Sequence, residues 1–397
     1  MKKIDSLTGL RFFAAAAIVL QHSQTVFFPL GTFEPFNLIG AVPLFFVLSG
    51  FVLALNVDRY RSWPAFIVAR IARIWPAHVA AIVFLFAIMY PYSPSLVASA
   101  DGIVKLVVNI LMLQAWSPDP AVYFSYNAPS WSISCELFFY LSFPLCVLVF
   151  ARRALIRLLL LCMAMSAFVC TVAWFDPGID AGWLSYINPV VNLPIFAIGV
   201  AAGLAMKHLA PRSSVGVGWA TLVQLVALAV ALAGNVVFIK RFIAVEAYYP
   251  FTLGAAPCYA VLLIALTRYN GAVSYGLSLA PMVYLGEISY SVYLFHQLII
   301  RWYSTYHTEF FDPAPIWLQC IGVWAATIGI SAFVHAAIER PARKWIPIAW
   351  AKFWMRRPVA TVDAFSVPKS THFAVTRSRQ GSAPLADSET ADGRRIR

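Results

Sequence analysis

Two ionisable side chains, Arg11 and His22, stand in the first strongly apolar run of the sequence. They are eleven residues apart, so on a helix they share nearly one face and lie about 16 Å apart along the axis. A histidine in such a run is either a satisfied core residue or a catalytic base. The arginine either snorkels to the interface or binds an anion there. The sequence around this pair has to decide between these interpretations.

A second cationic group is the pair Arg70 and Arg73 in the stretch "VARIARIWP". Residues three apart share a helical face, where two guanidinium groups repel each other unless an anion lies between them. Arginine is well suited to phosphate, so the pair favours a phosphate site. The alternative is an ordinary positive patch in an inner loop. The presence of Arg11 at the same membrane face favours the phosphate interpretation.

One carboxylate, Glu136, lies in the aromatic and serine-rich stretch "NAPSWSISCELFFYLSFP". We expect it to open a span at the outer side of the membrane, where aromatic residues commonly form an interfacial belt. A glutamate in the first helical turn is also favoured by the helix dipole, so a capping role stays open. The chemical alternative is that Glu136 orients His22 or tunes its charge.

Two further stretches combine small or polar residues with apolar ones. In "GEISYSVYLFHQ", Ser289, Tyr293 and His296 run roughly along one helical face, with His296 in the outer half of its span. Small hydroxyl residues often hold transmembrane helices together, and we expect that role here. In "FFVLSGFVL", Ser49 lies mid-span, where a small residue allows close approach of a helix or a ligand chain. Packing is the simpler interpretation, but Ser49 is also a candidate donor-binding residue.

Composition requires these residues to be positioned within a membrane. The chain has 397 residues, of which 61% are hydrophobic and only 12% are charged, and its mean hydropathy is +0.76. A soluble protein of this length would be unable to hide so much apolar surface from water. The formal charge of +12 then fits basic cytoplasmic loops better than a nucleic-acid partner. The six cysteines form no C-x-x-C pair, so neither a metal site nor a disulfide framework is expected.

We therefore predict an all-α polytopic transmembrane helix bundle. A helix needs about 20 apolar residues to cross the hydrocarbon core. On that basis the sequence predicts about ten spans, at residues 9–29, 38–56, 76–92, 136–151, 154–175, 190–206, 218–239, 249–267, 283–303 and 315–337. Segment 102–115 is apolar but short, and we expect it to be a re-entrant or interfacial helix.

Basic residues set the expected orientation. With the N-terminus inside, most arginines and lysines fall in inner loops, and few fall in outer loops. This asymmetry predicts that both termini are cytoplasmic. We expect residues 1–345 to form the transmembrane domain. Residues 346–397 are rich in Ser, Thr, Arg and Gly, and we expect them to form a disordered basic cytoplasmic tail.

Taken together, the stretches from about residue 5 to residue 345 resemble the membrane acyltransferase-3 family. The resemblance implies that Arg11 and His22 are essential and that the R-x-x-R pair helps to bind an acyl-coenzyme A donor. Two departures are His78, where the family more often has an aromatic residue, and Cys135 before the glutamate. The order and approximate spacing of six motifs carry the resemblance: "GLRFFAAAAIVLQHS", "PLFFVLSGFVL", "ARIARIWP", "PSWSISCELFFYLSFP", "LGEISYSVYLFH" and "IERPARKW".

The resemblance implies a membrane O-acyltransferase. Its acyl group, acetyl in the common case, would pass from cytoplasmic acyl-coenzyme A to a hydroxyl of an extracytoplasmic glycan, such as an exopolysaccharide or lipopolysaccharide sugar. His22 would act as general base or as acyl carrier, and these alternatives stay open. The expected location is a bacterial inner membrane, and no nucleic-acid partner is expected. The alternatives are a secondary transporter or exporter of a small or lipid-linked metabolite, and a non-enzymatic scaffold.

Overall fold

The computed structural model describes residues 4–28, 32, 38–60, 62–89, 99–150, 153–176, 178–209, 215–242, 248–310 and 313–355. These residues fold into helices and connecting turns, and no strand occurs among them. The all-α prediction is therefore confirmed for the described part of the chain. Met1–Phe353 form one compact unit, and the description below concerns that unit.

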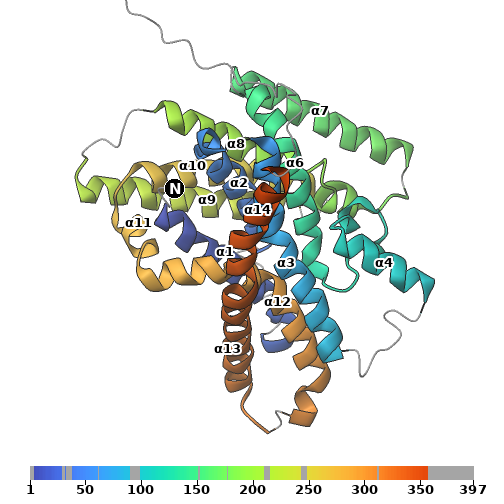
Figure 1. The fold of residues 1–397 in the computed structure, drawn as a ribbon. Helices are drawn as coiled ribbons and strands as arrows, with labels where there is room; N and C mark the ends of the chain where they lie inside the picture. Colours follow the sequence, from blue (N-terminus) through green and yellow to red (C-terminus); the bar gives the residue numbers. More distant parts are fainter. Residues whose placement is uncertain are drawn as a thin grey trace, which may run out of the picture. The chain divides into compact units, whose positions relative to one another are not determined.

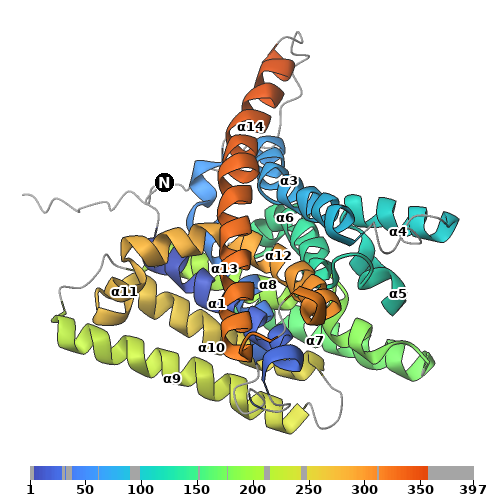
Figure 2. The ribbon, with the colours of Figure 1, turned by 90° about the horizontal axis from the view of Figure 1, so that it is seen from below.

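Figures 1 and 2 label the helices in their order along the chain. Short 3-10 turns at Leu38–Gly40 and Ala128–Ser130 precede two of them, and π-helical segments lie at Trp183–Ile187 and His335–Glu339. The α-helices are α1 (Asp5–Phe27), α2 (Ala41–Leu55), α3 (Trp63–Met89), α4 (Ala100–Ile110), α5 (Pro120–Tyr123), α6 (Trp131–Phe150), α7 (Ala154–Phe175), α8 (Leu193–His208), α9 (Val217–Phe242), α10 (Tyr248–Arg268), α11 (Ala272–Leu277), α12 (Ala280–Phe310), α13 (Ile316–Val334) and α14 (Arg340–Met355).

Among the helices of the structure, fewer are long and apolar enough to span a membrane than the sequence analysis predicts. In the described residues, six helical segments are long and apolar enough to cross a membrane, at Leu38–Leu55, Trp63–Ile88, Ala128–Phe150, Ala154–Phe175, Val217–Phe238 and Ile316–Trp354. Two more apolar helices are shorter, at Leu193–His208 and Leu253–Arg268. The long helices α1 and α12 are not among the six, because polar side chains interrupt their apolar runs. Ten spans and two cytoplasmic termini therefore stay predictions.

Several predicted boundaries differ from the structure, and three of them bear on the site or on the tail. The third span was expected at 76–92, but α3 begins at Trp63 and carries the arginine pair within it. The fourth was expected to begin at Glu136, but α6 begins at Trp131. In both cases polar residues near the start of the helix lower the local hydropathy, so the sequence prediction began the span too late. Inside the fold these polar residues lie near other polar side chains. At the other end of the unit, α14 continues to Met355, so residues 346–355 are helical, and residues 356–397 lie outside the described residues.

Close helix packing brings the functional segments together. α1 lies along α12, and α2 lies along α8. A Cβ atom added to Gly286 of α12 would come within 1.8 Å of the backbone oxygen of Thr8 in α1. A Cβ on Gly199 of α8 would come within 2.0 Å of the backbone oxygen of Val47 in α2. Only glycine permits these approaches, which is how small residues serve helix pairs in membranes.

The helix α7 supplies the clearest evidence of a lipid-facing surface. It lies at the edge of the bundle in Figure 1, and none of its residues is buried. Large apolar side chains cover it, and Trp174 and Phe175 are 81% and 80% exposed. A surface of that kind is stable in hydrocarbon and not in water. The chain is accordingly an integral membrane protein.

The connection between α3 and α6 folds back onto the bundle. Figure 2 shows α4 and α5 on the side of the molecule where α3 and α6 lie. His78 of α3 is fully buried, and its Nε2 donates to the carbonyl of Asn109 in α4 at 2.8 Å. Trp75 donates from Nε1 to the carbonyl of Ile110 at 2.9 Å. The segment predicted at 102–115 is therefore helical over Ala100–Ile110, and His78 helps to anchor it. Its re-entrant or interfacial placement stays a prediction.

Candidate functional site

A basic cavity lies between α1, α2, α3, α6 and α12, and we call it the arginine cavity. Its volume is about 90 Å³. It joins side chains that are far apart in sequence, since Arg11 comes from α1, Ser49 from α2, and Glu136 from α6. The polar or charged residues that line it are Arg11, Ser49, Arg70, Arg73, Ser132, Glu136, Tyr140, Ser289, Tyr290 and Tyr293.

The arginines of this cavity retain unused hydrogen-bonding groups. The Nε atoms of Arg11 and Arg70 are buried and have no hydrogen-bond partner among the described residues. The guanidinium of Arg70 lies over the ring of Phe66, 5.8 Å from its centre. Buried donors are almost always paired in folded proteins, so unpaired donors on clustered cations mark a site suited to an anion.

Glu136 belongs to this cavity and not to the environment that the sequence suggested. It lies in the second turn of α6, so the capping interpretation is wrong. Its carboxylate accepts a hydrogen bond from the hydroxyl of Tyr140, one turn further along the helix. Among the described contacts it has none with His22. A single carboxylate opposite three arginines leaves the cavity with a net positive charge, which again suits an anion.

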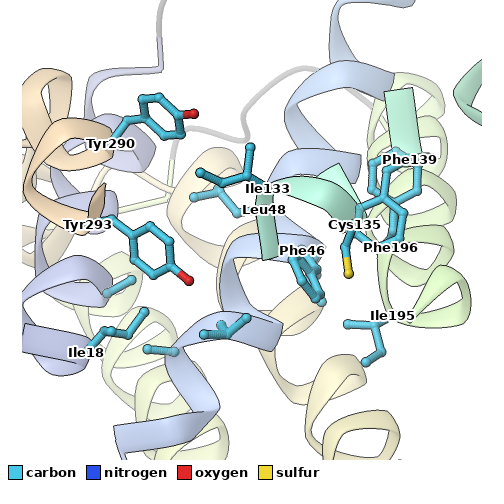
Figure 3. Close-up of a cluster of buried hydrophobic side chains, with 14 of the residues drawn as sticks. Ile18, Phe46, Leu48, Ile133, Cys135, Phe139, Ile195, Phe196, Tyr290 and Tyr293 are labelled. Atoms are coloured by element: carbon cyan, nitrogen blue, oxygen red, sulfur yellow. The ribbon is translucent and has the colours of Figure 1, made fainter. Parts of the chain in front are cut away.

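Two tyrosines of α12 form the side of the cavity opposite α2 and α6. Figure 3 shows the rings of Tyr290 and Tyr293 extending from α12 toward Leu48 and Ile133. The hydroxyl of Tyr290 donates to the carbonyl of Ile74 in α3 at 2.8 Å. That of Tyr293 donates to the carbonyl of Pro129 at 2.7 Å. Both rings are thereby fixed, and α12 is held to α3 and to the start of α6.

His22 pairs with His296 across the interface of α1 and α12. Its Nδ1 lies 2.8 Å from Nε2 of His296, whose side chain is fully buried. The two ring planes differ by 7° and their centres are 5.1 Å apart. Nearly parallel rings with such a short N···N distance are joined edge to edge by one N–H···N hydrogen bond. Sequence spacing had indicated neither this contact nor its partner.

The backbone determines which nitrogen of each ring carries the proton. Nδ1 of His296 lies 3.2 Å from the carbonyl oxygen of Val292, and a carbonyl only accepts. His296 therefore carries its proton on Nδ1, and its Nε2 accepts from Nδ1–H of His22. In this arrangement of neutral rings, Nε2 of His22 keeps a free lone pair. The pair thus presents a base at the open side of His22.

His22 borders a second cavity, which we call the histidine cavity. Its volume is about 410 Å³. Val42 and Tyr293 line this cavity and the arginine cavity alike, so the two cavities are adjacent at these side chains. Polar and aromatic residues on its other sides are Gln21, Tyr123, Phe124, Trp131, Asp180 and Tyr186.

The carboxylate of Asp180 is hydrogen-bonded within the histidine cavity. Its Oδ1 accepts from the hydroxyl of Tyr123 at 3.0 Å and from the backbone N–H of Trp183. Burial and this hydrogen bond raise the pKa of the Tyr123 hydroxyl, so the group stays a proton donor. Neither residue stands out in the sequence, because each lies alone in a connecting segment and the fold alone brings them together.

The predicted site residues therefore fall into two groups. Arg11, Ser49, Arg70, Arg73 and Glu136 line the arginine cavity, and His22 lines the histidine cavity. The two departures from the family pattern have structural roles. His78 anchors α4, and Cys135 is buried with its Sγ 3.3 Å from the carbonyl of Ile187.

The "IERPARKW" motif contacts α12 through a buried carboxylate. Glu339 is 1% exposed and accepts hydrogen bonds from Ser291 of α12 and from Arg343. His335 lies one turn before it, with Nδ1 3.2 Å from the carboxylate. Glu339 is the last residue of the π-helical turn His335–Glu339, and its carboxylate joins this turn to α12 through Ser291. This network fixes the helix that carries Tyr293 and His296.

Comparison with known proteins gives several relatives over most of the chain. Acyltransferase MdmB of Streptomyces mycarofaciens is 29% identical, covering 90% of this chain and 95% of that protein. Nodulation protein 10 of Rhizobium leguminosarum bv. viciae is 25% identical, covering 84% of this chain and 92% of that protein. Peptidoglycan O-acetyltransferase OatA of Listeria monocytogenes is 25% identical over 86% of this chain but 56% of its own length. No solved structure matches the chain.

The model of the acyltransferase-3 family, described as an acyltransferase domain, matches residues 4–335. That range contains both cavities and the histidine pair. It ends at the first residue of the π-helical turn. The chain therefore belongs to the acyltransferase-3 family and is a membrane acyltransferase.

Proposed function

We propose that the protein transfers an acyl group, acetyl in the simplest case, from acyl-coenzyme A to a hydroxyl of a glycan. The observation that carries the proposal is the adjacency of two chemically different cavities. One is cationic and suits the phosphates of coenzyme A, and the other presents the free nitrogen of His22. Val42 and Tyr293 lie between them, so an acyl group has only a short distance to pass.

The donor would bind through its charges. Coenzyme A is polyanionic, and Arg11, Arg70 and Arg73 offer charge-assisted hydrogen bonds at one cavity. Ser49 leaves room beside them for the narrow pantetheine arm. The cavity itself has too little volume for the whole donor, so the nucleotide would remain outside it. In the predicted topology this end faces the cytoplasm, where acyl-coenzyme A is found.

The acyl transfer would use His22 as a general base. Its Nε2 takes the proton of the acceptor hydroxyl while the hydroxyl oxygen attacks the thioester carbonyl. The C–S bond then breaks, an ester forms, and the coenzyme A sulfur receives the proton from His22. The hydrogen bond to His296 stabilises the positive charge that His22 carries between these two events. In the alternative, His22 accepts the acyl group first and the hydroxyl attacks it in a second step.

The nature of the acyl group and acceptor rests on relatives. A relative named a peptidoglycan O-acetyltransferase supports acetyl as the group and a glycan as the acceptor. Bacterial relatives support a bacterial membrane, and an extracytoplasmic glycan would make it the inner membrane. An exopolysaccharide and a lipopolysaccharide sugar are both compatible with this proposal. Membership of an acyltransferase family favours this reaction over the transporter alternative.

The decisive experiment is the His22→Asn substitution. Asparagine keeps a side chain of similar size but has no base, so we expect transfer to fall by roughly 10²–10⁴-fold. The measurement is label transfer from [14C]acetyl-coenzyme A to cell-envelope glycan, with protein abundance and acetyl-coenzyme A binding measured in parallel. We expect both to stay near those of the unmodified protein. The matched control is His208→Asn, at an exposed histidine ending α8.

Two results would contradict the proposal. Near-normal transfer by His22→Asn would make His22 a packing residue. Absence of acetyl-coenzyme A consumption by the unmodified protein, with glycan present, would remove the proposed donor. Loss of label transfer in His22→Asn together with normal abundance and donor binding would support the chemical role.

A further inference from the structure

We infer that the histidine cavity is the acceptor site and binds an uncharged sugar, with Asp180 and Tyr123 holding its hydroxyl groups. This inference rests on the proposed function and names the residues that would select its second substrate. It begins from the position of the cavity, which is the described cavity that reaches the imidazole of His22. A hydroxyl bound there lies on the side of His22 that presents the free Nε2.

The charges of the two cavities differ in sign. Three arginines line the arginine cavity, whereas no lysine or arginine is among the described residues that line the histidine cavity. The ionisable groups on the histidine cavity are His22, Asp180 and two tyrosines. A carboxylate repels phosphates and accepts hydrogen bonds from hydroxyl groups. Its lining therefore favours a neutral polyhydroxylated molecule and disfavours coenzyme A.

Asp180 is oriented for such a contact. Its Oδ1 is engaged by the Tyr123 hydroxyl and the backbone N–H of Trp183, which fixes the plane of the carboxylate. Among the described residues, no hydrogen bond reaches Oδ2. Hydrogen bonds to a charged acceptor are the strong ones, so a sugar hydroxyl donating to Oδ2 would be held firmly.

Aromatic side chains provide the complementary surface. Trp131 and Tyr186 line the cavity, with ring centres 4.9 Å apart and ring planes inclined by 56°. Trp131 also contacts Phe46, with ring centres 6.2 Å apart and ring planes inclined by 86°. The C–H faces of a sugar ring pack against rigid aromatic surfaces of this kind, while a few polar groups determine its orientation.

Part of this cavity is built by segments that connect the long helices, and such segments often determine which substrate an enzyme accepts. Asp180 and Tyr186 come from the connection between α7 and α8, and Tyr123 comes from the short helix α5. By contrast, the arginines come from the long helices α1 and α3. Connecting segments carry specificity on a fixed scaffold in many folds. This division would allow the acceptor site to differ between relatives that share one donor site.

The experiment compares Asp180→Asn with Asp176→Asn in the full-length protein in nanodiscs. Asparagine keeps the Oδ1 acceptor for Tyr123 and Trp183 and replaces only Oδ2, so the local fold has no reason to change. Asp176 is an exposed carboxylate at the end of α7 that does not line the cavity. The probes are [14C]acetyl-coenzyme A and chitotetraose, an uncharged oligosaccharide of N-acetylglucosamine. Transfer kinetics are measured together with equilibrium binding of chitotetraose without donor.

We expect Asp180→Asn to raise the KM for chitotetraose and its Kd by about tenfold or more. The KM for acetyl-coenzyme A should change by less than about twofold, and Asp176→Asn should behave as the unmodified protein. Tyr123→Phe, which removes one partner of Asp180, should weaken chitotetraose binding to a smaller degree.

Three outcomes would overturn the assignment of the acceptor site. These are unchanged chitotetraose binding in Asp180→Asn, an effect on the KM for acetyl-coenzyme A instead, or absence of chitotetraose binding by the unmodified protein. Failure of the proposed function is seen separately, because it would appear as absence of acetyl-coenzyme A consumption before any variant is compared.

Discussion

The hydrogen bond between His22 and His296 makes a quantitative prediction for the His296→Phe variant. Phenylalanine fills similar space but accepts no hydrogen bond, so Nδ1–H of His22 loses its acceptor. An unsatisfied buried donor costs about 1–3 kcal/mol, and His22 avoids that cost by moving its proton to Nε2. The base then has the wrong tautomer. Restoring the correct one costs the same 1–3 kcal/mol, which is about 5- to 150-fold in rate.

The loss is expected mainly in kcat. His296 is fully buried and does not line either cavity, so neither substrate should contact it. Under the proposed function, the N–H···N bond becomes charge-assisted when His22 is protonated, and its loss therefore weakens the transition state more than the ground state. We expect kcat to fall by this factor of about 5 to 150, with the KM for acetyl-coenzyme A nearly unchanged.

A conservative variant distinguishes this positioning role from packing. His296→Gln offers an amide oxygen in place of Nε2, so it should recover much of the activity lost in His296→Phe. The assay is acetyl transfer by purified protein, with thermal stability measured for each variant. Equal losses in the two variants would indicate packing alone. A rate for His296→Phe within twofold of the unmodified protein would refute the tautomer argument.

Two other predictions concern the donor site and the topology. Arg70→Ala with Arg73→Ala should weaken acyl-coenzyme A binding by about tenfold or more per arginine, and lysine at both positions should rescue only partly because it lacks the guanidinium fork. Unchanged donor affinity of the double alanine variant, measured by equilibrium binding, would remove the pair from the site. Reporter fusions at residues 120 and 385 should report opposite sides of the membrane. The same side for both would mean that segment 102–115 was misinterpreted.

The local part of the site was predictable from the sequence. The spacing of Arg11 and His22 predicted one helical face, and Arg11, Ile18 and His22 of α1 do line the two cavities. The spacing of Arg70 and Arg73 likewise predicted two side chains on one face, and both line the arginine cavity. These inferences needed only the geometry of a regular helix.

The depth of Glu136 was not predictable in the same way. Hydropathy suggested that its helix begins at the membrane surface, whereas α6 begins five residues earlier and Glu136 faces the arginines. That position depends on the preceding connection, which His78 and Trp75 hold against α3. A hydropathy pattern carries no information about such contacts between distant segments.

The partners of His22 and Asp180 are products of tertiary structure. His22 and His296 are 274 residues apart, and Tyr123 and Asp180 are 57 residues apart. Each pair joins two elements whose relative register depends on the whole bundle. The sequence marked His296 as a polar residue on a helix face, but it gave no reason to pair it with His22.

The wall formed by Val42 and Tyr293 has a consequence for the permeability of the membrane. In the predicted topology the arginine cavity faces the cytoplasm and the histidine cavity faces the outer side, so the two cavities together are close to forming a pore. Ions cross a narrow apolar constriction with difficulty because they must shed their water there. Val42 and Tyr293 are each only 7% exposed, and the tyrosine is fastened to Pro129. Under the proposed function, these two side chains have to let an acyl group through while holding back protons and salt. Smaller side chains at these two positions would then let ions leak across the membrane, and larger ones would block the acyl group.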